Sequence, residues 1–416
     1  MIFYDCTHIE RSKIHMNNFK DKIVELTDEY QPLFEKISRY IFENPELGGE
    51  EVLSAEYISN VLKEHNFKVE TPYESLPTAV IGSYINDPAY ENYAFLAEYD
   101  ALPGYGENNN ENAHACGHNW IAASMTGCAI VLSKISKELK INVHLIGTPA
   151  EETFGAKCNM IELGAFDNID FAFQAHMDAK NNMYVYNLAM NAIEFTFRGV
   201  PSHASRAPEK GVNALDAVIS MFVNVGLLRQ QMPSKDRIHG IITNGGTVHN
   251  VIPDLAVCRF CMRSPEKSSL EVLKNKVINI AKAAALSTGC SLEYDFFENP
   301  FDNMLHIDSM ISVTEENFNR FGVVDFAEKG FVGSPGSSDI GNVSYVCPTI
   351  YAEIGIDTPE SFPIHSNKAL EYADSQIAYD RMNQIIKGFC STVVDISQNR
   401  ELADKIKEEF KEKSSK

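Results

Sequence analysis

The spacing of apolar residues predicts an α/β arrangement in the first half of the chain. Residues 15–40 carry apolar side chains every three or four positions, which predicts an amphipathic helix, and a second helix is expected over about 50–65. The long apolar run 120–132 predicts a buried helix that continues to about residue 139. Short apolar runs typical of buried strands occur at 78–84, 93–98, 141–147 and 169–174. Strands that alternate with helices predict an α/β sheet with its functional residues at the carboxyl ends of the strands.

The pattern changes after residue 188. The segments that follow predict a strand, a helix, two strands, a helix and a last strand, at 192–200, 213–232, 238–243, 255–263, 269–288 and 291–297. This β-α-β-β-α-β order is that of a ferredoxin-like unit. We therefore predict that residues 189–303 form an α+β domain inserted into an α/β domain made of residues 1–188 and 304–416.

The remaining segments complete the first domain. A helix is expected near 307–321, a strand at 349–354 and a helix at 374–393. Two Gly-rich segments, 103–112 and 333–339, are predicted to be loops at the surface. The alternating Lys and Glu residues after about 401 predict a solvated helix or a frayed tail.

Composition narrows the function classes. The chain has 416 residues and a net charge of −21, which argues against nucleic acid or an anionic membrane as the main partner. Its nine cysteines are odd in number and irregularly spaced, so we expect no disulfide framework. A protein without disulfides fits the reducing cytoplasm, and we therefore expect a cytoplasmic location. The amino terminus lacks the pattern of a signal peptide, and no apolar stretch is long enough for a membrane helix.

Five residues with metal-binding side chains follow strands or lie in turns. They are Cys116, His118, Glu152, His176 and His365. Thiolate, imidazole and carboxylate groups bind divalent transition metals, and five ligands exceed the need of one tetrahedral ion. They would suit two ions that share a bridging hydroxide.

Two further carboxylates fit roles beside these ligands. Glu151 adjoins Glu152 and is a candidate general base, and Asp100 follows a neighbouring strand and is a candidate to orient a ligand imidazole. Each residue alone also has an ordinary structural interpretation: a core cysteine, helix-capping or first-turn residues, or surface histidines. The pair Cys258 and Cys261 lies in a predicted strand, where residues three apart face opposite sides, so no zinc site is expected there.

The motifs, taken together, resemble those of the M20 metallopeptidases, in the amidohydrolase branch that includes the auxin-conjugate hydrolases. The matching segments run in order along most of the chain: Asn44-Pro-Glu-Leu47, Ala97-Glu-Tyr-Asp-Ala-Leu-Pro103, His114-Ala-Cys-Gly-His-Asn119, Gly147-Thr-Pro-Ala-Glu-Glu152, Ala175-His176, Gly199-Val-Pro-Ser-His-Ala204, Gly211-Val-Asn-Ala214, Gly245-Gly-Thr-Val-His-Asn-Val-Ile-Pro-Asp254 and Pro363-Ile-His-Ser366. The residues around Asp100 and Asn119 are most similar to those of the M20-domain-containing dipeptidases and of the aminobenzoyl-glutamate hydrolases.

The resemblance implies a zinc-peptidase-like catalytic domain with an inserted ferredoxin-like lid through which two subunits dimerise. It implies the same five residues as ligands of two metal ions, Glu151 as general base and Asp100 as the assisting acid. His203 of the lid would reach the site of a partner subunit and stabilise the oxyanion, while Asn250 and, more weakly, Arg263 would contact substrate. Two features depart from the branch. Asn119 and Trp120 put an auxin-conjugate specificity in doubt, and the long Asn-rich loop at 104–112 implies a different access of substrate near Cys116.

We therefore expect a cytoplasmic homodimer that cleaves the amide bond of small dipeptides or N-acyl amino acids through a metal-bridging hydroxide. The ions would be Zn or Mn, with Co or Ni as alternatives. Two other functions stay open: hydrolysis of an aryl amide of the aminobenzoyl-glutamate type, and a catalytically silent metal-binding protein on the same fold.

Overall fold

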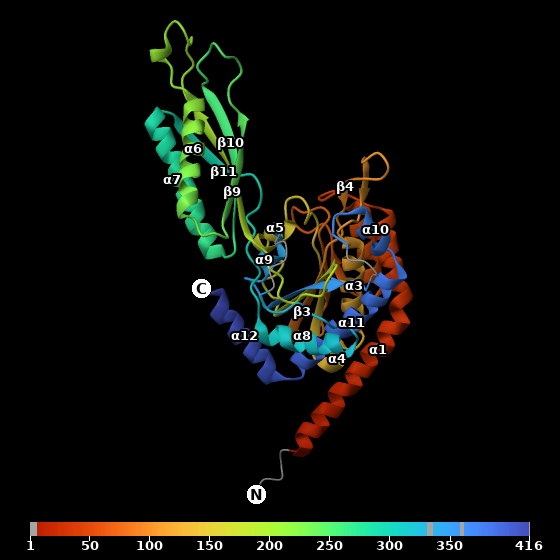
Figure 1. Cartoon of the computed structure of the whole chain (residues 1–416). Coiled ribbons are helices and arrows are strands. Elements are labelled where there is room, and N and C mark those ends of the chain that lie inside the picture. Colours follow the sequence, from red (N-terminus) through yellow and green to blue (C-terminus); the bar gives the residue numbers. More distant parts are fainter. Residues whose placement is uncertain (1–5, 331–335, 358–361, 416) are drawn as a thin grey trace. The chain divides into compact units, whose positions relative to one another are not determined.

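The computed structural model describes residues 6–330, 336–357 and 362–415, with side chains from residue 16 onward. The chain forms two compact units. The larger unit comprises Met1–Val185, Leu305–Val332 and Asn342–Lys416, and the inserted unit comprises Tyr186–Met304 and Gly333–Gly341. Figure 1 shows the elements of both units along the chain.

The larger unit is built on a mixed sheet of six strands in the order β1-β2-β6-β3-β7-β12. Strands β6, β3, β7 and β12 are parallel to one another. At one edge of the sheet, β2 pairs antiparallel with β6, and β1 pairs antiparallel with β2. The strands span Lys68–Glu70 (β1), Val80–Tyr84 (β2), Glu91–Ala97 (β3), Ile141–Gly147 (β6), Phe171–Asp178 (β7) and Thr349–Gly355 (β12). The carboxyl ends of four parallel strands therefore meet at one edge of the sheet.

Helices and sheet share one apolar core in the larger unit. Helix α3 (His118–Ser133) is buried along its whole length and packs against β3, β6 and β7. Helices α1 (Cys6–Glu43) and α11 (Gln376–Ser397) pack against α3 and against each other. The indole N–H of Trp120 in α3 donates a 2.7 Å hydrogen bond to the carbonyl of Ala378 in α11. This bond ties the helix that begins at His118 to the rest of the core.

Shorter helices complete this unit. They are α2 (Val52–Glu64), α4 (Ser136–Leu139), α5 (Ala156–Glu162), α8 (Asp308–Arg320), α10 (Asn367–Ala373) and α12 (Arg400–Ser414). A four-residue helix α9 (Ile340–Val343) spans the point where the chain leaves the inserted unit.

The inserted unit has the predicted β-α-β-β-α-β order. Its elements are β8 (Ala189–Arg198), α6 (Ala214–Leu228), β9 (Arg237–Asn244), β10 (Leu255–Ser264), α7 (Lys267–Thr288) and β11 (Ser291–Phe296). The strands form an antiparallel sheet in the order β11-β8-β10-β9, and α6 and α7 pack against it around their own apolar core. Cys258 is buried and Cys261 half-buried, as expected for opposite faces of β10. The predicted fold class, an α/β domain with an inserted ferredoxin-like domain, is confirmed.

Several local predictions were wrong. The loop predicted over 103–112 contains a hairpin, β4 (Leu102–Tyr105) and β5 (Glu111–Ala113). The helix predicted to reach residue 139 breaks between α3 and α4. The helix that was one of two possibilities after about residue 401 is present as α12, but it is not fully solvated, because its Ala403 and Ile406 are buried in the core. The elements β1, α5 and α10 were missed because they are too short to show a period. Of the predicted 333–339 loop, residues 333–335 lie outside the described part.

No helix in the described residues is long and apolar enough to cross a membrane.

Candidate metal centre

The five predicted ligands are presented at the carboxyl edge of the parallel strands. Strand β3 ends just before Glu98 and Asp100, and β6 ends before the loop that carries Glu151 and Glu152. His176 lies inside β7, not after the strand as the sequence had suggested. The other three ligands come from turns and a helix start that the fold brings to this edge.

The turn before α3 presents two of them. Cys116 lies in this turn, and His118 is the first residue of α3. Gly117 between them adopts a left-handed conformation (φ 75°), and a Cβ there would lie 2.7 Å from Cε of Met177. Only glycine fits both the backbone angle and the space, so the Cys-Gly-His turn depends on it. The backbone N–H of His365 donates to the carbonyl of Ala115 at 2.9 Å, which brings this third ligand to the same turn.

The loop after β6 is held by a buried carboxylate. Ala150 has φ 60°, a strained angle for a residue with a side chain. Its N–H donates to Glu51 Oε1 at 2.7 Å, and the hydroxyl of Thr78 donates to Glu51 Oε2 at 2.8 Å. The loop that presents Glu151 and Glu152 is therefore fixed by a residue from the start of α2.

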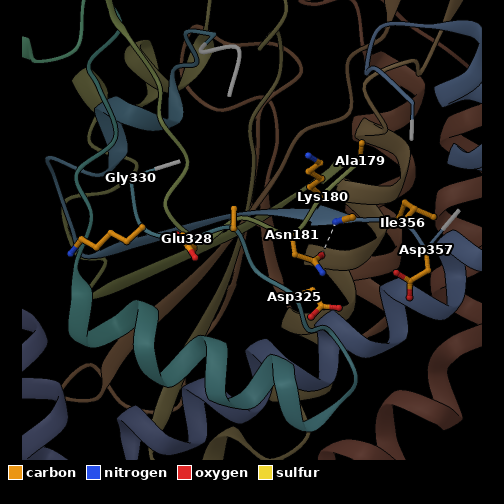
Figure 2. Close-up of a pocket in the computed structure, with 11 residues that line it drawn as sticks. Ala179, Lys180, Asn181, Asp325, Glu328, Gly330, Ile356 and Asp357 are labelled. Carbon is orange, nitrogen blue, oxygen red and sulfur yellow. Dashed lines mark hydrogen bonds between the residues drawn. The ribbon is translucent and has the colours of Figure 1, made fainter. Parts of the chain in front are cut away.

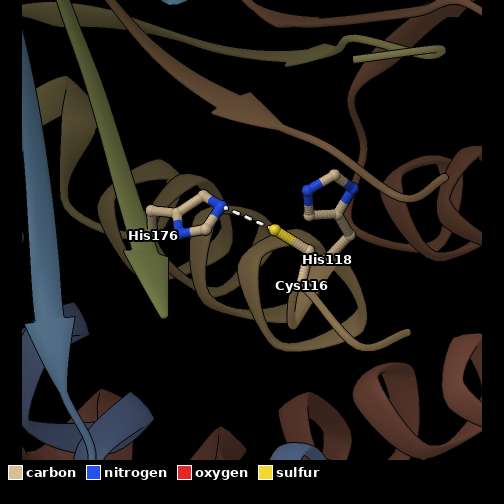
Figure 3. A group of neighbouring side chains, drawn as sticks. All are labelled: Cys116, His118 and His176. Atoms are coloured by element: carbon tan, nitrogen blue, oxygen red, sulfur yellow. Dashed lines mark hydrogen bonds between the residues drawn. The ribbon is translucent and has the colours of Figure 1, made fainter. Parts of the chain in front are cut away.

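The ligand atoms converge on the thiol of Cys116. Its Sγ lies 3.3 Å from His176 Nε2 and 3.2 Å from His365 Nε2. Glu152 Oε1 lies 3.0 Å from His365 Nε2 and 3.9 Å from His118 Nε2. Figure 3 shows the thiol between the rings of His118 and His176. Cys116 thus belongs to two groups of three, one with His118 and His176 and one with Glu152 and His365.

The two buried histidines of the cluster, His118 and His176, both turn Nε2 toward it. Asp100 Oδ1 accepts from His118 Nδ1 at 2.8 Å, and the carbonyl of Met177 accepts from His176 Nδ1 at 2.8 Å. Protons held on Nδ1 leave Nε2 as the ligand atom, the usual arrangement at metal sites. Among the described residues, His118 Nε2 is buried and lacks a hydrogen-bond partner.

These separations fit metal ions. Two atoms bound to one zinc ion at about 2.0–2.3 Å can be at most about 4.4 Å apart. The four separations given above lie between 3.0 and 3.9 Å. Thiol, imidazole and carboxylate atoms therefore meet at the distances that one or two transition-metal ions require.

Burial and charge shift the acid–base properties of the cluster in opposite directions. Burial raises the pKa of the Cys116 thiol, so ionisation of this group needs a cation nearby. Burial also opposes ionisation of Glu152, but the hydrogen bond from His365 and the charge of His118 outweigh it and lower the carboxyl pKa to about 2. Burial opposes protonation of His118, but Asp100 outweighs it and raises the pKa of the imidazole.

Asp100 occupies the orienting position predicted for it. Besides His118, it contacts the Glu152 loop, since its Oδ2 accepts from the Glu152 N–H at 2.9 Å. Its carboxylate is therefore bonded to two predicted ligands at once. Glu151 also lies here, and one of its carboxylate oxygens is within 4.8 Å of ligand atoms of His118 and Glu152.

Sequence reasoning missed two residues at this edge, Glu98 and Lys157. Both are fully buried, and the Lys157 ammonium donates to Glu98 Oε1 at 2.6 Å. Burial opposes ionisation of Glu98, but Lys157, His118 and His176 outweigh it and lower its pKa to about 2. The sequence did contain a signal for Glu98. It lies two positions before Asp100, and in an extended chain residues two apart point to the same side, so Glu98 could have been expected beside Asp100.

The three predicted lid residues lie in the inserted unit. His203 and Asn250 are exposed and close together, because the Ala204 N–H donates to the carbonyl of Asn250 at 3.0 Å. Arg263, at the end of β10, is half-buried, and its Nη1 lies 3.4 Å from Ser337 Oγ. Their roles stay predictions.

A cavity of about 650 Å³ opens beyond the carboxyl ends of β7 and β12. Figure 2 shows its wall, which includes Lys180, Asn181, Asp325, Glu328 and Asp357. None of the five predicted ligands lines the described part of this cavity. It is therefore separate from the cluster around Cys116.

Comparison with known proteins decides the family. The model of peptidase family M20/M25/M40 matches residues 94–387, which span β3 to α11 and include all five predicted ligands. The chain belongs to peptidase family M20. The resemblance inferred from the motifs is thus confirmed.

Individual relatives agree with this assignment. The chain is 34% identical over 416 aligned residues to the Xaa-Arg dipeptidase of Mus musculus, with 96% of this chain and 94% of the relative covered. It is 32% identical to a subunit of the p-aminobenzoyl-glutamate hydrolase of Escherichia coli, over 62% of this chain and 56% of that protein. Among solved structures, an aminohydrolase from methicillin-resistant Staphylococcus aureus shares the fold, with a TM-score of 0.75, 19% identity and coverage of 90% of this chain and 99% of that chain. This M20 protein is a metal-dependent hydrolase of amide bonds.

Proposed function

We propose that this protein is a two-metal dipeptidase in which Cys116 would help to hold both metal ions. One observation carries the proposal: two separate triads of ligand atoms contain the same thiol, and the two buried histidines turn Nε2 toward it. His118 and His176 would hold one ion with Cys116, while Glu152 and His365 would hold the other. The donor set suits Zn or Mn, and Co or Ni would also bind.

Bound divalent ions would polarise the amide carbonyl and lower the pKa of a water molecule toward neutrality. The residues of this chain do the remaining work. Glu151 takes the proton from the attacking water and returns it to the leaving amine. Asp100 keeps the proton of His118 on Nδ1 and holds the loop of Glu152, so both ligands stay in place.

We propose dipeptides with a basic carboxyl-terminal residue as the first substrate class. The relative named Xaa-Arg dipeptidase covers nearly the whole chain, and the net charge of −21 favours cationic ligands in general. N-acyl amino acids are the wider class. An aryl amide such as aminobenzoyl-glutamate is the second candidate, which the similarity to the E. coli hydrolase favours.

The inserted unit would act as a lid and as the surface of a homodimer. In that arrangement His203 stabilises the oxyanion in the partner's site, Asn250 contacts the substrate, and Arg263 binds a substrate carboxylate. These roles and the cytoplasmic location rest on the motif resemblance. A molar mass near 93 kDa in light scattering, twice the 46.5 kDa of one chain, would support the homodimer.

The test is hydrolysis of a small panel by purified protein loaded with zinc or manganese. The panel contains dipeptides ending in Arg or Lys, N-acetyl amino acids and aminobenzoyl-glutamate. We expect chelator-sensitive release of the carboxyl-terminal amino acid from the basic dipeptides. Release from aminobenzoyl-glutamate alone would favour the second candidate.

Glu151→Gln separates an enzyme from a silent metal-binding protein. Removal of a general base lowers turnover by about 10²–10⁴-fold. The variant should keep its bound metal, as measured by elemental analysis. Glu162→Gln, which changes an exposed glutamate in α5, is the matched control and should keep full activity. Full activity in Glu151→Gln would refute its role as base.

A further inference from the structure

Glu98 has one carboxylate oxygen bonded and the other not. Lys157 holds Oε1 at 2.6 Å. Oε2 is buried and has no hydrogen-bond partner among the residues that the structure describes. An unbonded buried polar atom costs about 1–3 kcal/mol, and more when it carries charge. A pair that served only to stabilise the core would not need to leave this oxygen unsatisfied.

The unbonded oxygen faces an unbonded nitrogen. Glu98 Oε2 lies 3.7 Å from His118 Nε2, which also lacks a hydrogen-bond partner in the described part of the chain. Asp100 accepts the proton of the other ring nitrogen, so Nε2 is the nitrogen of His118 that is placed to bind a metal ion. A carboxylate oxygen and an imidazole nitrogen are both metal-ligand atoms, and here both are buried, unbonded and facing each other.

The spacing suits such a cation. A nitrogen and an oxygen bound to one zinc ion at about 2.0–2.2 Å can be at most about 4.3 Å apart. The observed 3.7 Å lies within that limit, whereas it is too long for a direct hydrogen bond. Glu98 also lies beside the proposed base, because carboxylate oxygens of Glu98 and Glu151 are within 4.8 Å of each other.

Lys157 fixes the direction of this carboxylate. It lies in α5, which follows the loop of Glu151 and Glu152, and its ammonium reaches the residue that follows β3. The ion pair therefore joins the end of β3 to α5, the helix that follows the loop of Glu151 and Glu152. A full positive charge held inside the core is rare without such a partner.

We propose that Glu98 is a sixth metal-binding residue, whose Oε2 binds the ion held by His118 while Lys157 orients it through Oε1. The inference rests on the proposed two-metal centre. It adds a ligand on the buried side of the site, and it gives Lys157 a positioning role.

The test uses cobalt(II) titration of the metal-free protein, followed by visible absorption. The spectrum reports both affinity and coordination, and it does not depend on activity. The main variant is Glu98→Gln together with Lys157→Met, which removes the pair without leaving a single buried charge. Glu98→Gln alone is measured as well. The matched control is Lys20→Met with Asp395→Asn, which removes a different 2.6 Å ion pair that joins α1 to α11.

We expect the double variant to bind one of the two ions about 10–100-fold more weakly than the unchanged protein. The visible bands of that ion should also change, while the second ion keeps its affinity. The control pair should titrate like the unchanged protein. Circular dichroism of the metal-free variants verifies that each one is folded.

Three outcomes would overturn the inference. An unchanged affinity and spectrum in the double variant would show that Glu98 does not bind the ion. An equal loss in the control pair would show that the effect comes from general destabilisation. If the unchanged protein itself binds no cobalt, the proposed metal centre fails and this inference fails with it.

Discussion

Asp100→Asn tests whether one carboxylate sets the geometry of the metal centre. Asp100 is buried, and its two oxygens accept from His118 Nδ1 at 2.8 Å and from the Glu152 N–H at 2.9 Å. Asparagine keeps the shape, but only one of its two terminal atoms is an acceptor. Either the histidine or the backbone N–H then loses its bond.

The size of the effect follows from that loss. A buried donor without an acceptor costs about 1–3 kcal/mol. Independently, loss of a carboxylate that orients a metal-binding histidine lowers metal affinity by about 10–100-fold. At about 1.4 kcal/mol per tenfold change, this range equals about 1.4–2.8 kcal/mol, so the two arguments agree.

The assay is zinc binding in competition with a chromophoric chelator. We expect the Kd of Asp100→Asn to rise by about 10–100-fold. Asp170→Asn is the matched control, because Asp170 precedes the same sheet's β7 at its amino end and pairs with Lys407 instead. A Kd for Asp100→Asn equal to that of the unchanged protein would refute the reasoning that Asp100 orients His118.

Further predictions concern the turn before α3, a buried histidine and metal removal. Gly117→Ala should lower the unfolding free energy by at least about 1–2 kcal/mol, because the left-handed angle disfavours a side chain and Met177 blocks its Cβ. Gly226→Ala, where the space is open within helix α6, should instead stabilise slightly in the same denaturant titration. Burial lowers the pKa of His144 from 6.5 to about 4, so its contribution to stability is complete above pH 6.5 and is lost as the pH falls toward 4. This loss of stability is at most about 3 kcal/mol. In the His144→Gln variant, the melting temperature should therefore fall less steeply as the pH is lowered from 6.5 to 4. The control His239→Gln, at an exposed site, should leave this pH dependence unchanged. A chelator should lower the melting temperature of the metal-loaded protein, and excess zinc should restore it.

The sequence predicted the scaffold because its signals are local. Periodic apolar runs gave the long helices and buried strands, and strand β6 was predicted with the limits that it has. The order of elements after residue 188 was enough to predict the inserted unit. Short elements escaped, since a three-residue strand such as β1 or a seven-residue helix such as α5 contains too few positions for a period.

The candidate ligands were also readable from the sequence, because each follows or ends a recognisable motif. Their partners were not. The bond between Glu51 and the Ala150 loop joins residues 99 positions apart, and the contact of His365 with Cys116 spans 249 positions. A local sequence pattern does not predict contacts between residues that are so far apart along the chain.

The sequence by itself determined which residue types could do the chemistry and which family the chain resembles. Only the tertiary structure decided that Cys116 lies between two groups of ligands, and that Glu98 and Lys157 form a buried pair beside His118. The physical reason is that a hydrogen bond or a metal site depends on separations of a few ångströms. Those separations are set by how the strands align and how α3 packs against them, and not by the spacing of residues along the chain.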